Sequence, residues 1–181
     1  MRKKKTKKNS LIDQITAIQA SEVLRLLWNS DSEVRKKIEV AIKEQLIDVD
    51  YNEVCSEVDL ALSCLDVDEV YDHSGQRQDG YHDPGEVAIE MLENVCQEYE
   101  EQMKRYHQLQ MYEAEMEFCK GVLLALYKFE DNADEDFIAQ APEMAGETFR
   151  YILDDWKKRC YNKKYIKEMD DFIEDKCIKW K

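Results

Sequence analysis

The segment from residue 72 to residue 86 holds the densest group of side chains that could do chemistry. Carboxylates and imidazoles, the common ligands of divalent metals and the common acid–base groups, occur together there. Their spacing is neither the H-E-x-x-H of zinc proteases nor the calcium loop of an EF-hand, and the segment has no cysteine. The candidate metal ligands are Asp72, His73, Asp79, His82, Asp83 and Glu86.

The same residues have a simpler structural interpretation. Asp83 followed by Pro84 is typical of a helix start, with the acid at the N-cap and proline at the first helical position. The preceding glycine-containing stretch, residues 72–82, then forms a polar loop. We favour capping acids and solvated histidines over a metal, although this segment remains the best candidate site in the sequence.

The six cysteines could belong to a disulfide or zinc framework, but their spacing favours another role. No two of them form a C-x-x-C or C-x-C pair, and each lies on or beside the apolar stripe of an expected helix, where a thiol behaves as a small hydrophobe. We therefore expect reduced core thiols in a cytoplasmic protein. The cysteines are Cys55, Cys64, Cys96, Cys119, Cys160 and Cys177.

Other catalytic patterns are missing from the sequence. His107, in R-Y-H-Q-L-Q, lacks the lysine and glycine that follow the histidine of phosphotransfer bundles, so we expect a surface histidine at a helix end. The chain has no phosphate-binding G-x-x-x-x-G-K-[ST] loop and no G-x-S-x-G elbow. These observations favour a protein that is not an enzyme, with no catalytic residues and no cofactor.

The elements that would position such groups are helices. Two prolines and five glycines are too few for the turns of a sandwich or barrel. The most apolar run, F-C-K-G-V-L-L-A-L-Y-K-F from Phe118 to Phe129, is too short to span a bilayer and longer than a typical strand. It predicts a buried central helix over about 112–130, in which Gly121 permits close helix contact.

Apolar residues at spacings of three and four predict further helices around this one. Short connections between them predict antiparallel pairs. The fold class is therefore all-α, with successive antiparallel αα-hairpins packed as a bundle or as a short, right-handed TPR- or HEAT-like stack. We expect a disordered basic tail over 1–9 and a single all-helical domain over 10–181. The expected pairs are 32–47 with 54–65, 84–108 with 112–130, and 142–160 with 166–180, after one or two helices in 11–28.

The net charge of −14 is unevenly distributed. Residues 1–8 carry six basic side chains and no acid, whereas seventeen acids and one base lie between Asp48 and Glu101. An acidic surface repels phosphate, so nucleic acid could be bound only through residues 1–9 or the lysine-rich end from Lys157 onward. A protein partner of basic character, or a cation, suits this charge better. No apolar run reaches the ~20 residues of a membrane span, and the start lacks a signal-peptide pattern, so we expect no membrane partner and no export.

Several blocks together resemble a group of uncharacterised prokaryotic proteins. V-D-L-A-L-S-C-L-D-V-D-E-V-Y-D-H-S-G, G-Y-H-D-P-G-E-V-A-I-E-M-L-E, C-K-G-V-L-L-A-L-Y-K-F-E and L-D-D-W-K-K are similar to the helical region that follows their SWIM-type zinc finger. The resemblance covers roughly residues 50–160 and implies a helical scaffold. The finger itself, a C-x-C followed by C-x-H, is absent, so neither its zinc nor its nucleic-acid role is implied.

Three hypotheses for the function follow from these patterns. The leading one is a non-enzymatic helical scaffold that binds an unknown protein partner. The alternative is a metal-binding protein or metal-dependent enzyme that uses residues 72–86. The third is a nucleic-acid accessory protein that acts through the basic N-terminal tail.

Overall fold

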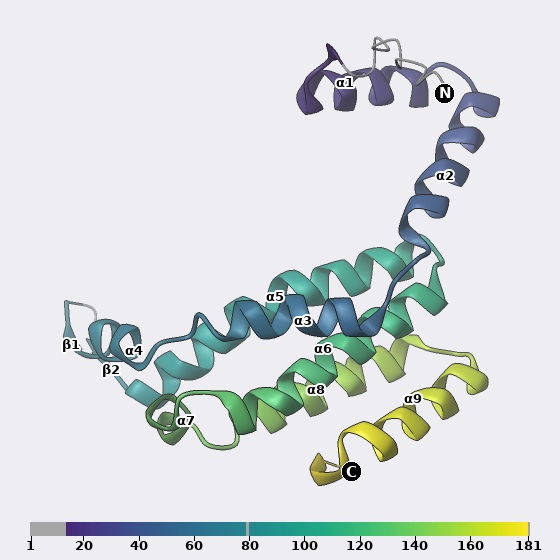
Figure 1. The fold of residues 1–181 in the computed structure, drawn as a ribbon. Helices are drawn as coiled ribbons and strands as arrows, with labels where there is room; N and C mark the ends of the chain where they lie inside the picture. Colours follow the sequence, from purple (N-terminus) through teal and green to yellow (C-terminus); the bar gives the residue numbers. More distant parts are fainter. Residues whose placement is uncertain (1–13, 79, 181) are drawn as a thin grey trace, which may run out of the picture. The chain divides into compact units, whose positions relative to one another are not determined.

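The computed structural model describes residues 14–78 and 80–180, and these residues are predominantly helical. They contain nine α-helices, one short 3-10 helix and one two-stranded hairpin, so the all-α prediction is confirmed (Figure 1). The chain divides into two compact units, residues 1–45 and 46–181. The sequence predicts one domain over 10–181 instead. The expected disordered tail, residues 1–9, lies outside the described residues.

The first unit contains α1 (Ala17–Trp28) and most of α2 (Ser32–Leu46). A capping box begins α1: the backbone N–H of Gln19 donates to Thr16 Oγ1 at 3.2 Å, and the N–H of Thr16 donates to Gln19 Oε1 at 3.0 Å. The Asp31 carboxylate accepts two backbone N–H groups and so begins α2. Neither helix has a buried residue. Periodicity predicted the helices, but it could not show that this segment has no core of its own.

The second unit is built around α6, as the sequence predicts. Thirteen of the 21 residues of α6 are buried, and α3, α5, α8 and α9 all contact it (Figure 1). The elements of this unit are α3 (Tyr51–Leu62), α4 (Val67–His73), β1 (Gly75–Arg77), β2 (Gly80–His82), α5 (Pro84–Gln108), α6 (Tyr112–Asn132), α7 (Glu135–Gln140), α8 (Met144–Arg159), α9 (Lys163–Lys176) and η2 (Ile178–Trp180).

The largest contact between two elements joins α3 to α6, and Gly121 makes it possible. A Cβ atom at Gly121 would lie 2.6 Å from Cβ of Val54 and 2.7 Å from the carbonyl oxygen of Tyr51. Both separations are shorter than packed atoms tolerate. The prediction that Gly121 permits close helix contact is therefore confirmed.

One of the three predicted hairpins forms as expected. Helices α5 and α6 pack against each other, and they are joined by a turn in which Gln110 adopts φ 59°. The predicted pairing of 32–47 with 54–65 would join the two units and stays a prediction; within the second unit, α3 packs chiefly against α6. Helices α8 and α9 likewise each pack against α6. A buried central helix can contact several neighbours at once, so sequence order does not fix the pairing.

A small antiparallel hairpin replaces part of the expected polar loop. Gly75 pairs with His82, Gln76 with Tyr81 and Arg77 with Gly80. Gly75 and Gly80 both have positive φ, which glycine adopts without steric cost. These strands are only three residues long, which leaves too few positions for an alternating apolar pattern to predict them.

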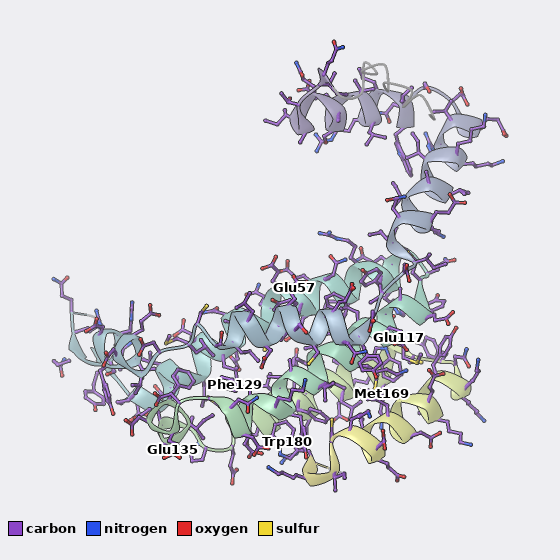
Figure 2. All side chains as sticks on the ribbon, viewed as in Figure 1. Glu57, Glu117, Phe129, Glu135, Met169 and Trp180 are labelled. Carbon is purple, nitrogen blue, oxygen red and sulfur yellow. The ribbon has the colours of Figure 1, made fainter. Side chains whose placement is uncertain are left out.

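The C-terminal end of the described chain completes the core. Trp180 of η2, labelled in Figure 2, packs edge-to-face on Phe149 of α8 and on Tyr127 of α6, with ring centres 5.1 and 5.3 Å apart. Such pairs add stability beyond the area they bury. Among the helices of the described residues, none is long and apolar enough to cross a membrane.

Candidate functional site

Five of the six candidate metal ligands are described, and they lie on or beside three different elements. Asp72 and His73 end α4, His82 is in β2, and Asp83 and Glu86 are at the start of α5. Asp79 lies outside the described residues. Among residues 14–78 and 80–180, no three His, Cys, Asp or Glu side chains are grouped so that they could hold a metal ion. Because Asp79 lies outside these residues, the metal site stays a prediction.

Two of these side chains bond to the backbone of their own helices. The Asp83 carboxylate accepts the backbone N–H of Gly85 at 2.9 Å and of Glu86 at 3.4 Å, which confirms its predicted role as the N-cap of α5. His73 Nδ1 lies 2.7 Å from the carbonyl oxygen of Glu69. A carbonyl only accepts, so Nδ1 carries the proton and cannot also bind a metal in this arrangement.

Arg77, the one base between Asp48 and Glu101, holds the hairpin against the end of α4. Its Nε donates to the carbonyl oxygen of His73 at 3.1 Å, and its Nη2 donates to that of Asp72. These carbonyls end a helix and would otherwise lack partners. The segment from 72 to 86 is thus organised by capping interactions at both ends.

A buried ion-pair network lies at the opposite end of α5. The Glu115 side chain is 3% exposed, and its two oxygens are 3.0 Å from His107 Nδ1 and 3.2 Å from Arg159 Nη2. Arg159 also pairs with Asp155 one turn earlier in α8. Burial of a carboxylate is costly unless it is paired, and here both oxygens have a partner. The network therefore fixes how α5, α6 and α8 meet.

Sequence reasoning missed this network and described His107 as a surface histidine. Its side chain is only 28% exposed and is bonded to Glu115. A signal was present, because Glu115 lies four residues after Met111 and four before Cys119, on the apolar stripe of α6. An acid at a stripe position predicts a buried partner. Beside the network, a pocket of about 350 Å³ is lined by Tyr112, Glu115, Trp156, Arg159, Cys160, Tyr161, Asn162 and Tyr165.

Lys120 is the second buried charged residue of the core. Its Nζ lies 2.6 Å from Glu117 Oε1 and 2.9 Å from Glu168 Oε1, which ties α6 to α9 (Glu117 is labelled in Figure 2). Nζ also lies 5.7 Å from the ring centre of Phe172. Burial acts to lower the pKa of Lys120, but the two carboxylates outweigh it and raise the pKa. Lys120 is therefore a charged structural residue and not a neutral nucleophile.

All six cysteines are free thiols, and four of them (Cys55, Cys96, Cys119 and Cys177) are buried. Burial, with a smaller contribution from Glu100 and Glu93, raises the pKa of Cys96 to about 12. Burial likewise raises the pKa of Cys177 to about 12 and that of Cys119 further. Burial also raises the pKa of Cys55, because it outweighs the opposite effect of Lys128, whose Nζ lies 3.4 Å from Cys55 Sγ. Thiols with raised pKa values are poor nucleophiles at neutral pH.

A groove of about 540 Å³ runs between α5 and α8. From α5 it is lined by Ile89, Glu93, Asn94, Cys96, Gln97 and Glu100, and from α8 by Met144, Glu147, Thr148 and Tyr151. These positions recur at spacings of three and four, so each helix presents one face to the groove. Met144 and Cys96 are buried beneath it, whereas Ile89 and Tyr151 are exposed at 37% and 57%. The groove therefore places two exposed apolar side chains, Ile89 and Tyr151, among carboxylates.

Two of the three carboxylates of this groove carry charge that no ion pair within the described residues compensates. Within the described residues, Glu93 and Glu147 form no ion pair, and Glu100 meets only Lys104, at 3.4 Å. Three acids line the groove and no base does. The sequence analysis did not identify this groove, because it depends on which faces of α5 and α8 meet in three dimensions.

No family model, curated protein or solved structure matches the chain. The resemblance to the helical region that follows SWIM-type zinc fingers therefore stays a prediction. The same holds for nucleic-acid binding through residues 1–9, which lie outside the described residues.

Proposed function

We propose that this protein is a non-enzymatic helical interaction module that binds a basic, helical segment of a protein partner in the groove between α5 and α8. The observation that carries the proposal is the groove itself, in which the exposed apolar side chains of Ile89 and Tyr151 lie among three glutamates. A helix that presents apolar anchors along one face docks in such grooves. The carboxylates would select lysine and arginine at the edges of that face.

The charge of the second unit supports the same class of partner. Residues 46–181 carry 34 acidic and 15 basic side chains. A field of that sign speeds association with a basic segment and disfavours nucleic acid and other anions. It also makes binding sensitive to salt, because exposed charges are screened over about 10 Å at 0.1 M ionic strength.

The state of the ionisable core residues supports a non-enzymatic role. Glu115 and Lys120 are fixed in ion pairs, and burial raises the pKa of the Cys96, Cys119 and Cys177 thiols. General acid–base and nucleophilic catalysis need a group that is available near neutral pH. We also place the protein in the cytoplasm, where thiols stay reduced.

Fluorescence anisotropy with synthetic peptides tests the proposal. The probe is an amphipathic helical peptide with leucine on one face and lysine on the other, and its control carries glutamate in place of lysine. We expect the full-length protein to bind only the basic peptide, with an affinity that falls as salt rises. Glu93→Gln with Glu147→Gln should weaken binding about tenfold or more, the loss expected from about 1.4 kcal/mol.

A matched pair of neutralisations separates the groove from overall charge. Asp171 and Glu174 are exposed carboxylates of α9 outside the groove, so Asp171→Asn with Glu174→Gln removes the same charge elsewhere. Equal loss in both double variants would show non-specific attraction and refute the groove. Failure of the basic peptide to bind at low salt would refute it as well.

A further inference from the structure

Helices α1 and α2 present apolar side chains that no other described residue of their unit covers. Every described residue of 14–45 is exposed or half-buried. In α1 the charged residues are Glu22 and Arg25 alone, and eight of its twelve residues are apolar. Exposed apolar clusters of this kind mark interaction sites. The large exposed side chains of α1 are Ile18, Val23, Leu24, Leu26, Leu27 and Trp28.

Local capping interactions nevertheless fix where both helices begin. A capping box begins α1, and Asp31 caps α2. The corner between them is held by Arg35, whose Nε donates to the carbonyl oxygen of Trp28 at 3.3 Å while its guanidinium lies 5.5 Å from the ring centre of Trp28. Isolated helices of 12 to 15 residues are marginal in water, so a partner that covered their apolar faces would stabilise both helices.

Charge indicates which partner fits. Residues 14–45 carry five acidic and five basic side chains, whereas residues 46–181 carry 34 and 15. Two copies of the second unit would repel each other. Two copies of α1 and α2 would not.

The exposed face of α2 is also complementary to itself. Lys36, Val40 and Glu44 follow one another at spacing four and so lie on one stripe, and Val40 is 55% exposed. When two α2 helices lie antiparallel with their Val40 residues opposite each other, Lys36 of each copy lies opposite Glu44 of the other. A two-fold contact requires such self-complementarity, because the same patch serves both partners.

We propose that α1 and α2 of one chain pack against α1 and α2 of a second copy, with the two α2 helices antiparallel about Val40. The contact then covers apolar side chains that each copy leaves exposed, Val40 among them. This contact is independent of the groove between α5 and α8, because it uses only residues of the first unit.

Sedimentation velocity of the full-length protein from about 1 to about 100 μM tests the contact. Leu26 in α1 and Leu60 in α3 are matched probes, since they are 72% and 70% exposed. We expect wild type and Leu60→Glu to form particles of twice 21.5 kDa. Leu26→Glu should raise the dissociation constant at least about tenfold. Equal effects of the two substitutions, or no effect of Leu26→Glu, would overturn the proposal.

A charge exchange tests the antiparallel register. Lys36→Glu places two carboxylates opposite each other at both ends of the pair and should weaken the dimer about threefold to tenfold. The double variant Lys36→Glu with Glu44→Lys should restore it. A double variant as weak as the single one would contradict this register.

Two other occupants would appear in the same experiments. A wild-type protein that stays monomeric at every concentration but sediments with phosphatidylserine vesicles would assign these helices to an anionic lipid surface. A monomer that does not bind the vesicles would indicate that α1 and α2 bind a different protein. Either result overturns the second-copy proposal.

Discussion

The two units use the same helical signals and bury very different amounts of apolar surface. In residues 46–181, caps such as Asp83 precede helices whose apolar stripes enter a shared core. In residues 14–45, Thr16 and Asp31 cap helices of similar periodicity, yet no residue is buried. Caps and spacing therefore determine where helices form, whereas burial depends on which stripes have a partner.

The charges of the two units differ in the same way. The described part of the first unit is balanced in charge, and the second unit is strongly acidic. A balanced apolar surface suits a contact between identical chains, whereas an acidic groove suits a basic ligand.

Truncation of one buried and one exposed leucine should give the largest difference in unfolding free energy between the two units. Leu123 of α6 is fully buried and Leu26 of α1 is 72% exposed. Leu123→Ala should lower the free energy of unfolding by ~2–5 kcal/mol, because it loses transfer energy and leaves a cavity. Leu26→Ala should change it by less than about 0.5 kcal/mol at concentrations where the protein is monomeric. Urea unfolding followed by circular dichroism measures both, and similar losses would remove the distinction between the units.

Gly121 tests how tightly the core helices approach. Gly121→Ala drives a methyl group against Val54 and the Tyr51 carbonyl and should cost ~1–3 kcal/mol. Gly146 in α8 is the control, because its nearest neighbour would be 3.6 Å from an added Cβ. Gly146→Ala should be neutral or stabilise by up to about 1 kcal/mol through helix propensity. A stable Gly121→Ala protein would refute the close α3–α6 contact.

The helix caps give a smaller, matched comparison. Asp83→Ala should lower the free energy of unfolding of the second unit by ~1 kcal/mol, whereas Asp83→Asn should be nearly silent, because asparagine caps about as well. Thr16→Ala removes the cap of α1 and should leave the unfolding of the second unit unchanged.

Thermal melts of wild type and the Asp83 variants, with EDTA and with added zinc, manganese or calcium, also test the metal site. A metal-dependent rise in the melting temperature that Asp83→Asn abolishes would favour the metal site over the cap.

Substitution of a cysteine should give the smallest change in stability. The thiols should nevertheless differ clearly in their access to solvent. Cys64 is exposed, whereas Cys96, Cys119 and Cys177 are buried with raised pKa values. At pH 8, below a pKa of about 12, the buried thiols are almost entirely protonated, so alkylation of the native protein should label Cys64 first. Cys64→Ser should alter stability by less than about 0.5 kcal/mol. Rapid native labelling of Cys119, read by mass spectrometry, would contradict the burial of α6.

Local signals in the sequence predicted much of the second unit. The Asp83–Pro84 helix start, the buried run of α6 and the α5–α6 hairpin depend on residues close together in the chain. The β-hairpin was missed because its strands are too short for periodicity. The division at residue 45 was missed because apolar stripes look alike whether or not they are covered.

The candidate sites were harder to predict for the same reason. The residues of the groove are ordinary stripe and flank positions of α5 and α8, and only the packing of those helices brings Glu93 near Glu147. The pairing of Glu115 with Arg159 joins residues 44 positions apart. Such contacts depend on tertiary structure that spacing alone does not reveal.

Hydrogen exchange of the full-length protein across a concentration series tests the contrast between the units most directly. Amides of α6 should be strongly protected at every concentration, because they open only with the core. Amides of α1 and α2 should exchange quickly in dilute protein and become protected as the concentration rises. Strong protection of α1 and α2 at the lowest concentration, or no gain at the highest, would contradict a first unit that is covered only by a second copy.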